Sequence, residues 1–175
     1  MSATVLEPYR TKAWPDQARR EIATMRTNAR HRPLQVYPLG VDPETRGCWS
    51  VAQLDVVSRR FHFKGKGEDR TVTIRLQRIA FVHLLRAMIE APTIVLGFGS
   101  ATTASYRTRE QQAALYAAAQ AGGYLAAPPC SSFHNKGISI DGFLWTTEER
   151  AVMREHGFYD LLPQDPPHYT YGVRG

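Results

Sequence analysis

The sequence predicts an α+β fold in which a small, largely antiparallel sheet packs against helices. Two kinds of segment lead to this prediction: some stretches have apolar residues at helical spacing, and others are short runs rich in β-branched and aromatic residues. The turn sequence KGKGEDR, residues 64–70, joins two of these short runs, residues 49–63 and 71–76, and predicts a basic hairpin. A length of 175 residues suits one core, so residues 1–175 are expected to form a single domain.

The first helix is expected at residues 14–31, with Asp16 as its N-cap. Its buried side is predicted to carry Ile22, Met25 and Ala29. Strands are predicted at residues 34–40, 49–63, 71–76, 93–102, 137–145 and 168–173. This order gives a helix followed by the hairpin in the N-terminal half of the chain.

A central core helix is predicted at residues 78–91 and is closed by Pro92. Its apolar residues at helical spacing are Ile79, Val82, Leu85, Met88 and Ile89. A third helix is expected within residues 106–123, because Thr108 and Gln111 have the spacing of a capping box. A fourth helix is expected near residues 146–158, with Thr146 or Thr147 as its cap.

Composition and charge exclude some classes of protein. Hydrophobic residues make up 43% of the chain, and no segment approaches the roughly 20 consecutive apolar residues that span a bilayer. The first residues lack the apolar stretch of a secretory signal, so we expect a chain made in the cytoplasm. The formal charge of +6 suits nucleic acid, an anionic membrane surface or an acidic polymer such as a bacterial wall, and does not choose among them. Cys48 and Cys130 are expected to be free thiols.

The stretch SSFHNKGISID, residues 131–141, holds the most informative polar residues. His134 and Asp141 lie on either side of Gly137, where the chain can bend. Because side chains alternate along a strand, Asp141 is expected on the face opposite to the two isoleucines of the motif. The bend would then bring the imidazole of His134 back over the carboxylate of Asp141.

A third candidate ligand comes late in the chain, in QDPPHYTY. Two prolines precede His168, and Asp165 is a second carboxylate nearby. Two imidazoles and one carboxylate suit zinc and leave the fourth position for water, on which Asp165 could act as a base. On spacing alone, a structural or exposed role for these histidines stays open.

The same residues carry a resemblance to a known family. SSFHNKGISID resembles the S-x-H-x-x-G-x-x-x-D signature of the zinc D-alanyl-D-alanine carboxypeptidase and L-alanyl-D-glutamate endopeptidase family, which is related to hedgehog and lysostaphin-type zinc folds. SYRTREQQAALYAAA resembles the family's Y-R-x-x-x-x-Q helix start, HGFYD its segment before the last strand, and DPPHYTY its terminal acid-x-x-H. The resemblance covers roughly residues 95–172, so residues 1–94 are either an N-terminal extension or a helix-and-hairpin part of the same domain.

The resemblance implies roles for seven residues. The implied zinc ligands are His134, Asp141 and His168, and the implied catalytic base is Asp165. Arg107 is implied to bind a substrate carboxylate and to polarise the developing oxyanion. Less specifically, Ser132 and Gln111 resemble residues that line the same pocket.

The resemblance also implies a substrate, the stem peptide of bacterial peptidoglycan. Family members that act as dipeptidases and carboxypeptidases usually carry Glu where this chain has Asp165, whereas many phage endopeptidases resemble it in carrying Asp. Ser139, two residues before the aspartate, is a mild departure from the family's small residue. We therefore expect a monomeric phage lysin or virion-associated enzyme that cleaves L-alanyl-D-glutamate bonds in the wall and binds neither nucleic acid nor membrane.

Other functions remain open at this point. A D-alanyl-D-alanine carboxypeptidase would use the same residues, and a non-catalytic zinc module of a virion or wall-binding protein would use the same ligands. A cysteine peptidase would pair Cys130 with His134 or His168. The basic hairpin is expected to be a solvated surface, although contact with anionic wall polymers stays open. Histidines expected to be structural or exposed are His31, His62, His83 and His156, and tryptophans expected in the core or at its rim are Trp14, Trp49 and Trp145.

Overall fold

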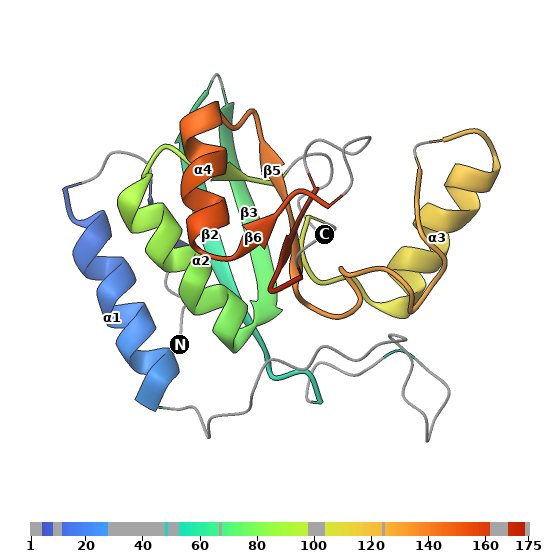
Figure 1. Ribbon diagram of the computed structural model, residues 1–175, viewed down its shortest axis with the longest axis horizontal. Helices are drawn as coiled ribbons and strands as arrows, with labels where there is room; N and C mark the ends of the chain where they lie inside the picture. The colour runs from blue at the N-terminus through green and yellow to red at the C-terminus, as the bar shows by residue number, and fades with distance from the viewer. Residues whose placement is uncertain are drawn as a thin grey trace.

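The computed structural model describes residues 5–8, 12–27, 48, 53–66, 68–97, 104–123, 125–161 and 168–173. Within these ranges the chain is a mixed α+β protein with four helices and two small sheets (Figure 1). The helices are α1 (Trp14–Thr27), α2 (Arg78–Glu90), α3 (Arg109–Gln120) and α4 (Thr147–Glu155). The strands are β1 (Val5–Leu6), β2 (Val56–Gly65), β3 (Glu68–Gln77), β4 (Val95–Leu96), β5 (Ser139–Phe143), β6 (Phe158–Tyr159) and β7 (His168–Tyr171).

The first sheet has the order β1-β2-β3 and confirms the predicted hairpin, because β2 and β3 pair antiparallel. Alternate side chains of the hairpin form one buried apolar face: Phe61, Phe63, Val72, Ile74 and Leu76. The same hydrophobic cluster includes residues of α1 and α2. Trp14, at the start of α1, is fully buried and donates a hydrogen bond from its indole nitrogen to the carbonyl of Met88 in α2, at 2.7 Å.

The second sheet has the order β4-β5-β7-β6 and is antiparallel throughout. Its central pairing sets Asp141 of β5 opposite His168 of β7. Ile138 and Ile140 are fully buried, and Ile140 belongs to the apolar cluster. The expected alternation is confirmed, since Asp141 turns to the opposite, polar side of β5.

Residues 104–107 connect the two sheets. The amide of Tyr106 donates to the carbonyl of Arg75 in β3, and the amide of Asp141 in β5 donates to the carbonyl of Ala104.

Gly137 lies in the bend that precedes β5. It has a φ of 67°, and a Cβ at this position would lie 3.0 Å from Cγ2 of Val56. The bend that precedes β5 therefore needs glycine for both its backbone conformation and its close packing.

Helix α3 lies apart from α1, α2 and α4 (Figure 1). It begins with the predicted capping box of Thr108 and Gln111, and Thr146 forms the corresponding box on α4. Gln112 is the buried residue of α3. Of the described part of the chain, no helix is both long and apolar enough to cross a membrane.

Several details differ from the sequence predictions. Two small sheets form where one was expected, the strand expected at residues 49–63 begins at Val56, and β4 comprises Val95–Leu96 of the strand expected at residues 93–102. The helix expected near residues 146–158 ends at Glu155, and β6 follows it.

Cys48 and Cys130 form a disulfide rather than two free thiols. Asp16 lies in the first turn of α1 and is not its N-cap, because the helix already begins at Trp14. Ile79 is 38% exposed, because α2 turns a neighbouring set of residues to the core: Ala80, Phe81, Val82, Leu84, Leu85, Ala87 and Met88. The strand predicted at residues 34–40 lies outside the described residues. The same holds for three single residues named above: Ala29, His31 and Trp49.

Candidate metal site

Three side chains from β5, β7 and the turn before β5 meet at one point. His134 Nε2 lies 3.0 Å from His168 Nδ1 and 3.2 Å from Asp141 Oδ1, and His168 Nδ1 lies 3.5 Å from Asp141 Oδ1. Ligand atoms bound at about 2.1 Å to one tetrahedral ion would be separated by roughly 3.4 Å. The observed separations therefore suit three ligands of a single metal ion.

The partners of His134 fix its tautomer. Its Nδ1 lies 2.7 Å from the carbonyl oxygen of Ser105, and a carbonyl can only accept a hydrogen bond. Nδ1 must therefore carry the proton, which leaves a lone pair on Nε2 when the ring is neutral. Burial lowers the pKa of His134 by more than the negative charge of Asp141 raises it, and this favours the neutral ring.

His168 has a corresponding partner on its far side. Its Nε2 lies 3.1 Å from the hydroxyl of Thr170, and that hydroxyl lies 2.9 Å from the hydroxyl of Ser139. Thr170 can accept a hydrogen bond from His168 and donate one to Ser139. In that arrangement His168 Nδ1 presents its lone pair to the same point as His134 Nε2.

Asp141 supplies the negative charge of the cluster. Burial raises the pKa of its carboxyl. The neighbouring His134, His168 and Arg107 together lower this pKa by more than burial raises it, so the carboxylate is ionised. Arg107 Nη2 donates to Asp141 Oδ2 at 2.8 Å. The two carboxylate oxygens thus have separate partners, with Oδ2 on the guanidinium and Oδ1 facing the imidazoles.

These observations test whether the cluster fits a metal ion. With both rings in the tautomers described, two lone pairs and one carboxylate oxygen converge without a proton between them, and their side chains are only 2%, 6% and 11% exposed. Converging buried acceptors repel one another unless a cation lies among them. The ring hydrogen bonds to Ser105 and Thr170 are also the outer contacts that usually orient metal-binding histidines.

Of the residues predicted to line the pocket, Ser132 contacts the amide of a candidate ligand, and Gln111 caps helix α3. Ser132 is buried, and its hydroxyl accepts a hydrogen bond from the amide of His134 at 3.2 Å. The side chain of Gln111 instead accepts from the amide of Thr108 at the start of α3. Gln111 is thereby engaged as a helix cap.

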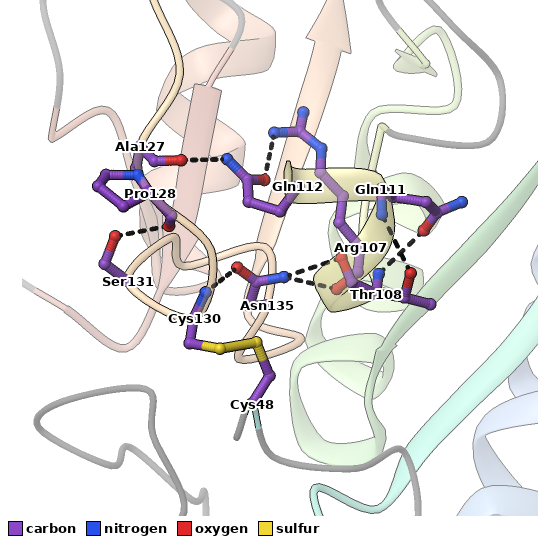
Figure 2. Close-up of a disulfide and its surroundings, with 10 residues drawn as sticks. All are labelled: Cys48, Arg107, Thr108, Gln111, Gln112, Ala127, Pro128, Cys130, Ser131 and Asn135. Atoms are coloured by element: carbon purple, nitrogen blue, oxygen red, sulfur yellow. Dashed lines mark hydrogen bonds between the residues drawn. A yellow bond between two sulfur atoms is a disulfide. The ribbon is translucent and has the colours of Figure 1, made fainter. Parts of the chain in front are cut away.

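Gln112 occupies the position beside Arg107. Its Oε1 lies 3.4 Å from Arg107 Nη1, and its Nε2 donates to the carbonyl of Ala127 at 2.7 Å (Figure 2). The pattern Y-R-x-x-x-x-Q, counted from Tyr106, ends on Gln112 and not on Gln111. The spacing of that pattern was the signal that could have identified Gln112.

The structure also bears on the remaining candidates. Asp165 lies outside the described residues, so its predicted role as a base stays a prediction. His62, His83 and His156 contact residues away from the cluster, namely Asp69, Tyr171 and Glu90 respectively. Because Cys130 is in a disulfide, it offers no thiolate, and this contradicts the cysteine-peptidase alternative.

Comparisons with protein-family models, with curated proteins and with solved structures found no match for this chain. The fold and the site therefore define the protein by their own features. It is a mixed α+β protein with a buried cluster, His134, Asp141 and His168, that could bind a metal ion.

Proposed function

We propose that the protein is a zinc metallopeptidase that hydrolyses the L-alanyl-D-glutamate bond of peptidoglycan stem peptides. The observation that carries the proposal is the convergence of His134 Nε2, Asp141 Oδ1 and His168 Nδ1. Two imidazoles and one carboxylate are a donor set that zinc prefers, and three protein ligands leave a fourth position open, as in catalytic zinc sites. When bound, zinc supplies Lewis acidity and lowers the pKa of a water molecule.

The residues of the chain itself would perform the remaining tasks. Arg107 holds Asp141 through Oδ2 and places a fixed positive charge at the cluster, where a substrate carboxylate or a developing oxyanion would be stabilised. Asp165, three residues before His168 in the sequence, would accept and return the proton. The resemblance of both positions to the family pattern supports these roles.

The disulfide supports a site of action outside the reducing cytoplasm. Disulfides persist mainly in oxidising surroundings, such as secreted proteins, periplasms and virion surfaces. The Cys48–Cys130 bond is therefore compatible with an enzyme that acts on the bacterial cell wall as a lysin or a virion component. It also agrees with the proposed substrate, which lies outside the cell membrane.

A second candidate is a non-catalytic zinc module. The observation that favours it is burial, because the residues His134, Asp141 and His168 are only 1%, 8% and 5% exposed. A catalytic site must be open to its substrate, whereas a structural site has no such requirement and can be fully buried. The test of the proposal must therefore separate zinc binding from hydrolysis.

The test is a digestion of purified peptidoglycan by the zinc-loaded protein, with new termini identified by mass spectrometry. We expect new N-terminal D-glutamate and C-terminal L-alanine, loss of both with a chelator, and recovery on adding zinc. Release of single D-alanine would instead show a carboxypeptidase. Stoichiometric zinc without any new terminus would favour the non-catalytic module, and absence of zinc binding would refute the metal centre.

Substitutions in the same assay separate ligand from base. His168→Ala should abolish zinc binding and hydrolysis together, because it removes a ligand. Asp165→Asn should keep zinc bound and lower turnover by about a hundredfold or more, the effect of losing a positioned base. His156→Ala is the matched control and should keep both properties, since His156 pairs with Glu90 away from the cluster. Equal zinc loss in Asp165→Asn would show that Asp165 is a ligand.

A further inference from the structure

The side chain of Asn135 bonds to three backbone groups beside the candidate metal site, at Cys130 and at the neighbouring residues Arg107 and Thr108. Asn135 follows the ligand His134 directly and is only 1% exposed. Its Oδ1 accepts a hydrogen bond from the amide of Cys130 at 3.0 Å, and its Nδ2 donates to the carbonyls of Arg107 at 2.8 Å and Thr108 at 3.3 Å (Figure 2). One acceptor and two donors are thus used on three backbone groups, a set that only a primary amide can satisfy.

Two hydrogen bonds, one of them from Asn135, hold the backbone of Arg107. Asn135 holds the carbonyl of Arg107, while the amide of Arg107 donates to the carbonyl of His134 at 3.3 Å. From this backbone position the guanidinium reaches Asp141 Oδ2. A shift of the Arg107 backbone would therefore change how Asp141 is held and where its Oδ1 points.

The third contact ties Asn135 to the disulfide. Cys130, whose amide donates to Asn135, has a φ of 68°, in the left-handed region that residues other than glycine seldom adopt. Its sulfur is bonded to Cys48, 82 residues earlier in the chain. The covalent bond to a distant segment restrains the loop in which Cys130 presents its amide.

We infer that Asn135 is a positioning residue for the metal centre and that the Cys48–Cys130 disulfide holds it in place. This inference rests on the proposed zinc site and adds to it a chain of contacts from the disulfide through Asn135 and Arg107 to Asp141. Partners outside the ligand set commonly change metal affinity by about 10–100-fold when they are substituted. The disulfide thereby contributes to zinc affinity without contacting the site.

The inference is tested by zinc affinity, measured by competition with a chromophoric chelator. Asn135→Asp keeps the acceptor for Cys130 but turns a carboxylate oxygen toward two carbonyls, and Asn135→Ala removes all three bonds. A Cys48→Ser/Cys130→Ser double variant removes the disulfide without thiol reductants, which themselves bind zinc. We expect at least about a tenfold weaker zinc affinity in the folded Asn135 variants and in the double variant.

A second readout separates positioning from general loss of stability. Cobalt(II) bound in place of zinc has an absorption spectrum that reports ligand geometry, and we expect this spectrum to change in the same variants. The matched control is Thr146→Ala, which removes a helix cap on α4 far from the network and should destabilise the protein with no change in zinc affinity or cobalt spectrum.

Each outcome has a definite meaning. Zinc affinity and cobalt spectrum equal to those of the wild type in either folded Asn135 variant would overturn the role of Asn135. An effect of the Asn135 variants without any effect of the double cysteine variant would overturn the role of the disulfide. If Thr146→Ala weakens zinc binding equally, the effect is one of stability, and the inference is wrong. Failure of the wild type to bind zinc would instead refute the proposed function.

Discussion

The hairpin layer, formed by the apolar face of β2 and β3 with the α2 residues packed on it, and the candidate metal site are buried to a similar degree but differ in chemistry. In the first, Phe61, Phe63 and Phe81 are fully buried, and the rings of Phe63 and Phe81 each stack on Phe61, with centroid separations of 5.6 and 6.0 Å. In the second, His134 and Asn135 are almost completely buried but polar. The first region is held by contacts that have no required direction, and the second by hydrogen bonds that each need a particular partner.

The difference shows what each region contributes. Apolar burial supplies free energy of folding, and it tolerates exchange of side chains of similar volume. Buried polar groups contribute little net stability, but each one becomes costly when its partner is lost. We therefore expect substitutions in the hairpin layer to change the free energy of unfolding, and substitutions around the cluster to change metal affinity.

The largest expected effect is that of Phe61→Ala. Removing a fully buried aromatic ring from the packed core should lower the free energy of unfolding by about 3–5 kcal/mol, measured by urea denaturation. Zinc affinity of the folded protein should not change, because Phe61 packs in the apolar core against the rings of Trp14, Phe63 and Phe81. Arg60→Ala is the control, since Arg60 is the exposed neighbour of Phe61 and should cost less than about 0.5 kcal/mol. A parallel loss of zinc affinity would show that the two regions are not separable.

An intermediate effect is expected for Gln111→Ala. Gln111 is the third residue of α3, and its side chain completes the capping box by accepting from the amide of Thr108; losing one such hydrogen bond costs about 0.5–1.5 kcal/mol. Hydrogen exchange of the Thr108 amide should accelerate, because its acceptor on the Gln111 side chain is gone. Unchanged exchange at the Thr108 amide would contradict the capping role of the Gln111 side chain.

The smallest expected effect concerns His83, a polar residue within α2. Partial burial lowers the pKa of His83 below its ordinary value of 6.5, and the positive charges of Arg86, His156 and Arg26 lower it further. As the pH falls below 6.5, the unfolded chain takes up this proton more readily than the folded protein, so stability decreases. His83→Gln should therefore lose less stability than the wild type between about pH 7.5 and pH 5.5, measured by urea denaturation without zinc. Identical losses in both proteins would exclude His83 as a source of the pH dependence.

Local patterns in the sequence predicted local structure well. The capping boxes at Thr108 and Thr146 were predictable because each involves residues only three positions apart. The cap of α1 was predicted wrongly, because the helix already begins at Trp14, which is buried and bonded to Met88 of α2, and Asp16 therefore lies within the first turn. A choice of cap made from sequence cannot include a contact with a helix so distant in the chain.

The cluster was predictable from the ordered motif, but its surroundings were not. His134, Asp141 and His168 come together as the spacing and the resemblance implied. The side chain of Asn135 bonds to backbone groups of other residues, and Ser105 contacts His134 through its own backbone carbonyl. Contacts with the backbone leave no signature in the pattern of side chains along the sequence. The Cys48–Cys130 disulfide was missed because a reducing compartment was expected for the chain, and because the two cysteines meet only in the tertiary structure.

The pairing of β5 with β7 also bears on when the site is assembled during folding. His134 and Asp141 belong to one continuous segment, but His168 comes into position only when the later strand β7 aligns with β5 in the register that sets it opposite Asp141. Pairings between separate segments form more slowly than local turns. Metal uptake should therefore be a late event on the folding pathway, and the moment of zinc capture would serve as a kinetic marker for completion of the second sheet.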